Sequence, residues 1–345
     1  MKAVRRIGVF WALSAVLASV ATGQQRGAQK ELRAYITNSG SNNVSVIRVA
    51  DDTVVNTITV GKGPVGVAAA PDGSKVYIAN TLSATISVMD TLTNRIISTL
   101  AVEKAPHALA LSPQGDRLYI VHDRLGMADY SRISVVDTVK NVVAHTFADQ
   151  LLAKHGVALS PDGNQVYVSN FGGNDLLVFD TQELKIVKTV PLGQLPDGVA
   201  VSSDGAYLYV VNHGEANLSV LASKDFTEIK RVTVGDGPFA VALLPRAHKA
   251  YVTLQGTIEA NDKVVIFDTA KNEVVGTITV GRMPMGIAVT PDNRKIYVVN
   301  KMANTVSVID PTQDKVVTTI AVEDSPVALG NFIGAVPTQQ TQQTQ

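Results

Sequence analysis

Apolar and polar residues alternate in short runs along most of the chain. Ile86-Ser87-Val88-Met89 is one such run; the others are also rich in Val, Ile, Thr and Tyr and are bounded by Gly, Pro, Asn or Asp. A period of two is typical of β-strands, whereas an amphipathic helix needs a period of about 3.6 sustained over some ten residues. Beyond residue 23 no stretch avoids these breakers for long enough, so the pattern predicts an all-β protein.

The strand pattern recurs as seven copies of one unit. Each unit contains a tetrapeptide that begins with tyrosine, such as YITN at the first copy and YVVN at the last, with spacings of 42, 42, 48, 42, 42 and 46 residues. Four strands fit in each unit, and a four-stranded repeat of this length is typical of a β-propeller blade. We therefore expect a seven-bladed β-propeller with four antiparallel strands per blade, in which the tyrosines pack one blade on the next. These tyrosines are Tyr35, Tyr77, Tyr119, Tyr167, Tyr209, Tyr251 and Tyr297.

Turn residues separate the strands at fixed places in the unit. Pro71-Asp72-Gly73 and Pro161-Asp162-Gly163 place proline first and a residue that tolerates positive φ third, and Pro291-Asp292-Asn293 does the same with asparagine. An aspartate also recurs just before the outer turn in five of the seven units. Its position indicates that the side chain makes the hydrogen bonds that start the turn, rather than belonging to a ring of functional carboxylates. These aspartates are Asp90, Asp137, Asp180, Asp268 and Asp310.

The two ends of the repeat region predict how the ring closes. The first unit begins at its tyrosine strand, and the last ends with residues 326–330, which resemble the strand that precedes each tyrosine. We expect residues 327–329 to pair with residues 34–38, so that the C-terminal strand completes the N-terminal blade. Closure of this kind leaves no open end to the array.

The N-terminus has the order of a secretory signal. Lys2, Arg5 and Arg6 precede an apolar run at residues 7–21, and small residues follow. The run is shorter than the roughly 20 residues that span a bilayer, although an uncleaved anchor is the alternative. We expect residues 1–23 to be a cleaved signal, residues 24–335 to form the propeller, and the Thr/Gln-rich residues 336–345 to be a disordered tail. The mature protein is then periplasmic or secreted, at the cell surface included, and has no membrane span.

Composition excludes several classes of protein. The chain of 345 residues is 46% hydrophobic and 5% aromatic, with thirty basic and thirty acidic side chains. This balance argues against a nucleic-acid groove, and no nucleic-acid partner is expected. Cysteine is absent, which excludes disulfides, thiolate zinc sites, a thiol nucleophile and covalent c-type haem.

The Tyr-Val-x-Asn, Val-Ser-Val-Ile-Asp and Pro-Asp-Gly pattern resembles the YVTN-repeat β-propeller family of bacterial periplasmic and archaeal surface-layer proteins. The resemblance covers residues 34 to about 332. It implies the propeller fold. Together with its wider lactonase-like relatives, the family includes adhesive, ligand-binding, haem-handling and enzymatic members, so the resemblance leaves the activity open.

Departures from the repeat consensus indicate where a site lies. A Gly-x-x-Pro corner, as at residues 61–64, or a variant of it precedes the strand before each later tyrosine strand, and Lys154 replaces its proline in the third copy. The position after this corner, at one mouth of the channel, changes from apolar to titratable in three consecutive units. It reads Val65, His107, His155, Asp197, Phe239, Met285 and Val327 around the ring. The asparagine that ends the tyrosine strand is replaced by His122 in the third unit, and His213 follows Asn212 in the fifth.

Imidazoles with a nearby carboxylate suit a divalent metal or a general base. His107, His122, His155 and His213 are therefore the predicted ligands of a zinc, copper or iron ion, with solvated loop histidines as the alternative. Asp197 and Phe239 of the ring, with Arg124 and Arg132 of a longer loop at residues 123–132, are the predicted ligand-binding residues. The loop at residues 255–263 is also longer than its counterparts. No catalytic residue is assigned.

Three functions fit these features. The first is a monomeric binding or scaffold protein that presents a site for a protein or small molecule at this mouth. The second is a metal-dependent enzyme, either a lactonase- or lyase-like hydrolase or an oxidoreductase, that uses the histidines. The third is a haem-handling propeller, although propellers that carry haem d1 have eight blades and the sequence predicts seven.

Overall fold

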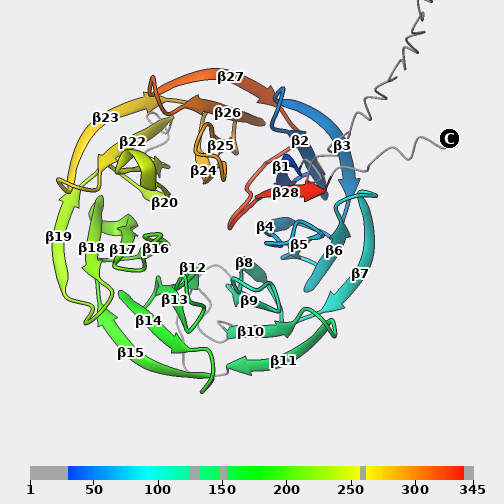
Figure 1. Cartoon of the computed structure of the whole chain (residues 1–345), viewed down its shortest axis with the longest axis horizontal. Helices are drawn as coiled ribbons and strands as arrows, with labels where there is room; N and C mark the ends of the chain where they lie inside the picture. Colours follow the sequence, from blue (N-terminus) through cyan, green and yellow to red (C-terminus); the bar gives the residue numbers. More distant parts are fainter. Residues whose placement is uncertain (1–29, 124–131, 148–153, 257–261, 338–345) are drawn as a thin grey trace, which may run out of the picture.

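The structure is a computed structural model that describes residues 30–123, 132–147, 154–256 and 262–337. The described residues form seven four-stranded antiparallel sheets arranged around a central channel, as the repeats predict (Figure 1). No described helix is long and apolar enough to cross a membrane. The predicted signal, residues 1–23, lies outside the described residues.

Each blade contributes one strand to the channel and one to the outer rim, and in blades 2 to 7 the strands follow one another outward along the chain (Figure 1). Blade 2 consists of β4 (Pro64–Ala69), β5 (Lys75–Asn80), β6 (Thr85–Asp90) and β7 (Arg95–Ala101). Blade 3 consists of β8 (Pro106–Leu111), β9 (Arg117–His122), β10 (Arg132–Asp137) and β11 (Val142–Phe147). Blade 4 consists of β12 (Lys154–Leu159), β13 (Gln165–Asn170), β14 (Asp175–Asp180) and β15 (Lys185–Pro191).

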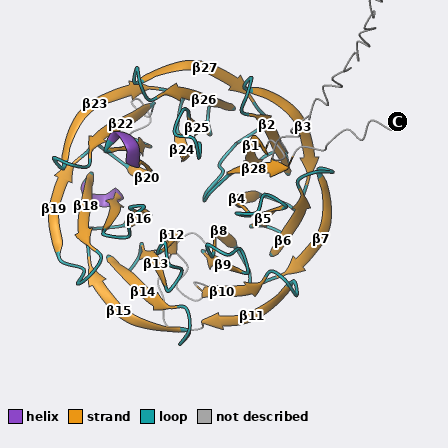
Figure 2. Ribbon diagram, in the orientation of Figure 1, coloured by secondary structure: helices purple, strands orange, loops and turns teal. Residues whose placement is uncertain are grey.

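Blades 5 to 7 repeat the arrangement, and two short 3-10 helices interrupt their turns (Figure 2). Blade 5 consists of β16 (Pro196–Val201), β17 (Tyr207–Asn212), β18 (Asn217–Ala222) and β19 (Glu228–Thr233). Blade 6 consists of β20 (Pro238–Leu244), β21 (Lys249–Leu254), β22 (Lys263–Asp268) and β23 (Glu273–Thr279). Blade 7 consists of β24 (Pro284–Val289), β25 (Ile296–Asn300), β26 (Thr305–Asp310) and β27 (Lys315–Ala321). The helices are η2 (His213–Glu215) and η3 (Pro245–Ala247).

Blade 1 is closed by the C-terminal strand, but by a later segment than the sequence predicts. β1 (Lys30–Asn38), β2 (Asn43–Arg48) and β3 (Thr53–Thr59) are joined by β28 (Ile333–Pro337), which pairs with residues 30–34 of β1. The last strand therefore extends into the predicted tail as far as Pro337. Residues 338–345 lie outside the described residues.

Residues 326–331, which include the segment predicted to close the ring, form a crossing segment instead. The amide of Val327 donates to the carbonyl of Thr37 on β1, and the chain then leaves β1 for blade 2. There the amides of Val67 and Ala69 donate to the carbonyls of Leu329 and Asn331, at 2.8 and 2.9 Å. The prediction that residues 327–329 are the closing strand is corrected, because these residues bridge two blades inside the channel.

The core lies between the blades, where the faces of neighbouring sheets pack on each other. In the interface of blades 2 and 3, Tyr77 and Ile86 pack with Leu118 and Ile120. All seven repeat tyrosines are at most 3% exposed, which confirms their structural role.

The turns also behave as predicted. Gly73 and Gly163 have φ of 80° and 76°, and Asn293 has φ of 62°. The recurring aspartates accept hydrogen bonds from the backbone amides of the turns that follow them, as Asp90 does from Thr93 at 2.8 Å. These carboxylates are therefore structural.

Candidate functional site

Seven side chains, one per blade, gather at the end of the channel where the inner strands begin. Six of them lie in a β-bulge, because the register of each inner strand shifts just after its first residue, as between Pro196 and Val199 in β16. A bulge redirects a side chain out of the regular pleat. We call these residues the inner ring; they are Val65, His107, His155, Asp197, Phe239, Met285 and Val327.

Glycine after several inner-ring residues lets neighbouring blades approach closely at the channel. A Cβ on Gly156 would meet the carbonyl oxygen of Asp197, and a Cβ on Gly198 would meet that of Phe239. Only glycine fits such a backbone contact without displacement. The Gly residue in His-Gly and Asp-Gly therefore brings successive inner-ring residues together.

One half of the inner ring is apolar. Phe239, Met285 and Val327 pack with Leu329 in a buried cluster, and Val65 lies against it. All four clustered side chains are less than 10% exposed.

The other half of the inner ring contains His155, which is the centre of an ionic cluster. Its Nε2 lies 3.0 Å from Oδ2 of Asp123, and its Nδ1 lies 3.3 Å from Oδ2 of Asp197. The side chains of His155, Asp123 and Asp197 are 17%, 2% and 5% exposed. The ring of Phe171 stacks on His155 with centroids 4.2 Å apart and planes inclined by 15°. His155 is thus fixed on both nitrogens and on one face.

The two carboxylates determine the charge of His155. Burial by itself lowers the pKa of His155, but Asp197 and Asp123 outweigh it and raise this pKa to about 10. Burial raises the pKa of Asp197, and His155 opposes that shift. At neutral pH the cluster therefore holds an imidazolium between the two carboxyl groups.

His107 has the opposite electrostatic environment. Its ring centroid lies 5.5 Å from that of His155. Burial, and secondarily the charge of His155, lower the pKa of His107 to about 4. The inner ring therefore pairs a neutral imidazole with a cationic one.

Sequence reasoning missed Asp123 and Phe171, which belong to a second position that varies between blades. This position directly follows the end of each tyrosine strand. It reads Ser39, Thr81, Asp123, Phe171, His213, Gln255 and Lys301. His213, the one member predicted, has its ring centroid 6.3 Å from that of Phe171 and a buried Nδ1 without a hydrogen-bond partner. Comparing this position across the repeats would have indicated all three residues.

His122 is held inside blade 3. Its Nε2 lies 2.9 Å from Oγ of Ser134, and its Nδ1 lies 3.1 Å from the carbonyl oxygen of Lys104. In other blades an asparagine makes the equivalent bond, as Asn80 does to Ser87 at 2.9 Å. His122 therefore substitutes for the repeat asparagine, and neither ring nitrogen is available to a ligand.

The predicted metal ligands do not form a coordination site. Both nitrogens of His155 contact carboxylates and both nitrogens of His122 are hydrogen-bonded, which separates these two from any shared ion. Within the described ranges no group of three or more His, Asp or Glu side chains is placed to hold a metal ion.

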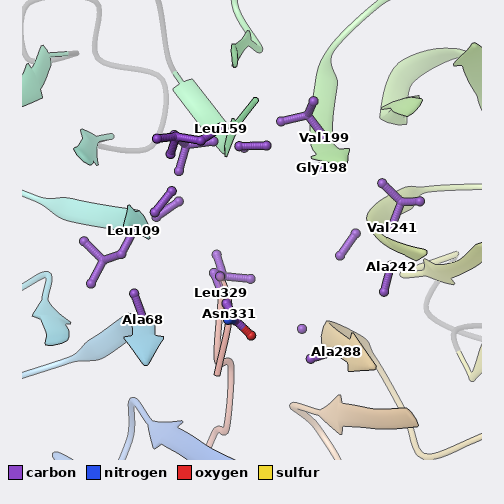
Figure 3. Close-up of a pocket in the computed structure, with 18 of the residues that line it drawn as sticks. Ala68, Leu109, Leu159, Gly198, Val199, Val241, Ala242, Ala288, Leu329 and Asn331 are labelled. Carbon is purple, nitrogen blue, oxygen red and sulfur yellow. The ribbon is translucent and has the colours of Figure 1, made fainter. Parts of the chain in front are cut away.

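A cavity of about 600 Å³ occupies the channel and reaches the ionic cluster. Its floor includes His155, Asp197 and Phe239, and it extends to Pro71, Pro113 and Pro161 on the Pro-Asp-Gly face, all three exposed. Figure 3 shows Leu329 and Asn331 of the crossing segment near the centre of the space that Ala68, Leu109 and Val241 surround. The sequence predicts a site that opens at the Gly-x-x-Pro mouth. The cavity instead extends from the Pro-Asp-Gly end of the channel and reaches the same residues from there.

The predicted loop arginines are not part of this cavity. Arg132 lies 3.8 Å from Glu103 in an exposed ion pair and is not among the residues that line the cavity. Arg124 lies outside the described residues, as do most of the two longer loops. Phe239 and Asp197, the other predicted ligand-binding residues, both contribute to the floor.

The fold and the ring of inner strands define a seven-bladed β-propeller with a channel cavity. Comparison with known families agrees. Residues 89–243 match the family described as lactonase, 7-bladed beta-propeller, and residues 10–153 match the family described as YNCE-like beta-propeller. No curated protein sequence shows significant similarity to the chain.

Solved structures of low sequence identity share the fold. The hydrazine synthase of Kuenenia stuttgartiensis superposes with a TM-score of 0.72 at 20% identity, over 80% of this chain and 91% of that one. A functionally unknown protein from Desulfotomaculum acetoxidans gives 0.75 at 15% identity, over 90% and 100%. A putative 6-phosphogluconolactonase from Bacteroides uniformis gives 0.72 at 17% identity, over 89% and 100%. At these identities the likeness concerns the fold alone.

Proposed function

We propose that this protein is a binding protein that holds a small organic molecule in its central channel. The observation that carries the proposal is the cavity of about 600 Å³ whose walls are apolar and whose floor holds a fixed ionic cluster. Ligand pockets are commonly about 300–1,000 Å³ in volume, mostly apolar, with a few oriented polar groups. The channel has all three properties.

The walls are suited to an apolar body. Val157, Val199, Val241 and Ile287 come from four different inner strands, and the described lining contains no lysine or arginine. Val199 and Val241 line the cavity and are only partly buried, and each also packs against the core between two blades. A ligand that covers them removes apolar surface from water, worth about 25 cal/mol per Å².

Obstruction of the channel tests this proposal. The neutral apolar probe N-phenyl-1-naphthylamine is expected to fluoresce on binding to the native protein, and Val199→Trp and Val241→Trp to reduce its affinity at least tenfold. Val187→Trp is the matched control, because Val187 is 44% exposed on the outer strand β15. Equal probe binding by all four proteins, each folded by its melting curve, would show that the channel is not the binding site.

One observation favours an enzyme as the second candidate. His107 is neutral and lies beside the cationic His155 in the inner ring of residues. Neighbouring groups whose pKa values are driven apart are typical of acid–base chemistry. In a lactone hydrolase His107 would take a proton from water as the water oxygen bonds to the carbonyl carbon, and would return that proton to the ring oxygen as the ring C–O bond breaks.

A lactone hydrolysis assay tests this candidate. General base catalysis contributes about 10²–10⁴-fold, so His107→Gln is expected to lose at least a hundredfold in the rate of hydrolysis of gluconolactone or butyrolactone. His248→Gln, at the exposed turn after η3, is the matched control. Hydrolysis no faster than in buffer would leave the binding protein as the function.

We also propose that the protein acts outside the cytoplasm. The support is the signal-like order of residues 1–23 and the absence of cysteine. Fractionation of the producing cell and N-terminal sequencing should find the mature protein in the periplasm or medium, starting at residue 22, 23 or 24. A cytoplasmic protein that begins at Met1 would contradict the proposal.

A further inference from the structure

The ionic cluster carries an uneven number of charges. It contains the carboxylates of Asp123 and Asp197 but a single imidazolium, His155, and so has a net charge of −1 when all three are ionised. Oδ1 of Asp123 is buried and has no hydrogen-bond partner. A buried negative charge without full compensation is costly, and a bound cation relieves that cost.

The other titratable groups near the cluster do not line the cavity. Lys301 follows β25 at the Gly-x-x-Pro end and acts electrostatically on His107. His213 follows β17 at the same end and acts on Asp197. Neither lines the cavity, whose described lining has Asp197 and His155 as its only ionisable side chains.

Resting on the proposed channel-binding function, we infer that the preferred ligand is an organic cation: an amine whose ammonium group lies at Asp197 and whose apolar body lies along the channel walls. Asp197 is the carboxylate on the floor, and both nitrogens of His155 are already directed at carboxylates. Phe239 is an aromatic residue on the same floor, and cations bind favourably over aromatic faces. An anionic head group would instead meet the carboxylate of Asp197 with no free cation beside it.

Three ligands of equal chain length separate the head group from the apolar body. Isothermal titration of the mature protein at pH 7 would use octylamine, octanol and octanoate. We expect octylammonium to bind at least tenfold more tightly than octanol, and octanoate to bind most weakly. Octanol or octanoate binding as tightly as octylammonium would overturn the inference while leaving the channel function intact. Failure of all three to bind would overturn the channel function itself.

Substitution of the floor carboxylate is the second arm. Asp197→Asn is expected to lower the affinity for octylammonium to that for octanol and to leave octanol binding unchanged. Asp236→Asn, at an exposed corner before β20, is the matched control and should retain the amine preference. If Asp197→Asn does not fold, its place is taken by Asp123→Asn, which removes the same unit of charge from behind His155. Retention of the tenfold preference in the folded variant would overturn the inference.

Discussion

His155 and Asp197 occupy the same position in consecutive repeats, 42 residues apart, and join blades 4 and 5 through an Nδ1 and an Oδ2 that are 3.3 Å apart. The two side chains are nearly buried at the floor of the channel. Their contact therefore ties two sheets together at the point where the cavity ends.

Removing either member of this pair should destabilise the propeller. Breaking a buried ion pair costs about 3–5 kcal/mol, because the remaining charge loses its partner. We expect His155→Gln and Asp197→Asn each to lower the free energy of unfolding, and the double variant to lose less than the sum of the two. Urea denaturation of all four proteins measures the coupling energy, and purely additive losses would show that the two side chains do not interact.

His155 and His107 should make the stability of the folded protein depend on pH in opposite directions. The pKa of His155 is about 10 in the folded protein and about 6.5 unfolded. Its contribution is therefore complete below pH 6.5 and declines as the pH rises towards 10. The pKa of His107 is about 4 when folded, so the unfolded chain takes up its proton first and stability falls as the pH drops from 6.5 to 4.

Melting curves between pH 4 and pH 10 test this assignment. His107→Gln should remove part of the acid-side loss, and His155→Gln should remove part of the alkaline-side loss. His248→Gln, on an exposed turn, serves as the control. Parallel profiles for all variants would contradict the assigned charge states.

Ring closure should depend on β28 and on the residue that precedes it. Phe332 is fully buried, and its carbonyl accepts a hydrogen bond from the amide of Tyr35 at 2.9 Å. Phe332→Ala should cost about 3–5 kcal/mol.

Three truncations separate the parts of this terminus. A chain ending at residue 331 should lose much of its solubility or thermal stability, and one ending at residue 325 should lose more, because it also lacks the crossing segment. A chain ending at residue 337 should melt like the intact protein. If the chain ending at residue 331 melts like the intact protein, β28 does not close the ring.

His122 should tolerate asparagine better than alanine. An asparagine restores the residue that bonds serine in the other blades, whereas alanine leaves the buried Oγ of Ser134 without that partner. An unsatisfied buried polar group costs about 1–3 kcal/mol. Denaturant midpoints should therefore rank native and His122→Asn above His122→Ala. Equal loss in both variants would indicate that ring volume, rather than hydrogen bonding, matters here.

The histidines should not bind a divalent metal as a group. Titration of the demetallated protein with zinc and copper is expected to show no micromolar site that is lost in both His107→Ala and His155→Ala. Elemental analysis of the purified protein provides an independent measurement. A stoichiometric metal that either variant abolishes would restore the predicted metal centre.

The repeats specified the fold because each copy independently encodes a blade. Seven tyrosines, seven strand patterns and the recurrent turns all lead to one architecture. The closing strand was misplaced because residues 327–329 resemble the inner strand of every other unit, whereas residues 333–337 do not. Their role depends on a contact with residues 30–34, some 300 residues away, which local pattern does not encode.

The site was predicted in part for a similar reason. The inner ring occupies equivalent positions, so comparing the copies located His107, His155 and Asp197. Asp123 of blade 3 and Phe171 of blade 4 contact His155 from the position that follows each tyrosine strand. Only the three-dimensional structure shows that this position meets the inner ring. The charge on His155 depends on distances to two carboxylates, which no sequence pattern provides.

The pairing of β1 with β28 sets an order of events in folding. Arg33 lies opposite Gly334 in that ladder, so the first blade lacks its innermost strand until residues 333–337 have been synthesised. Forming a contact between such distant residues carries a large loop-closure entropy and is slow. The remaining blades are continuous in sequence and do not wait for it. The growing chain therefore retains one unpaired strand edge that only its own last segment is shaped to cover.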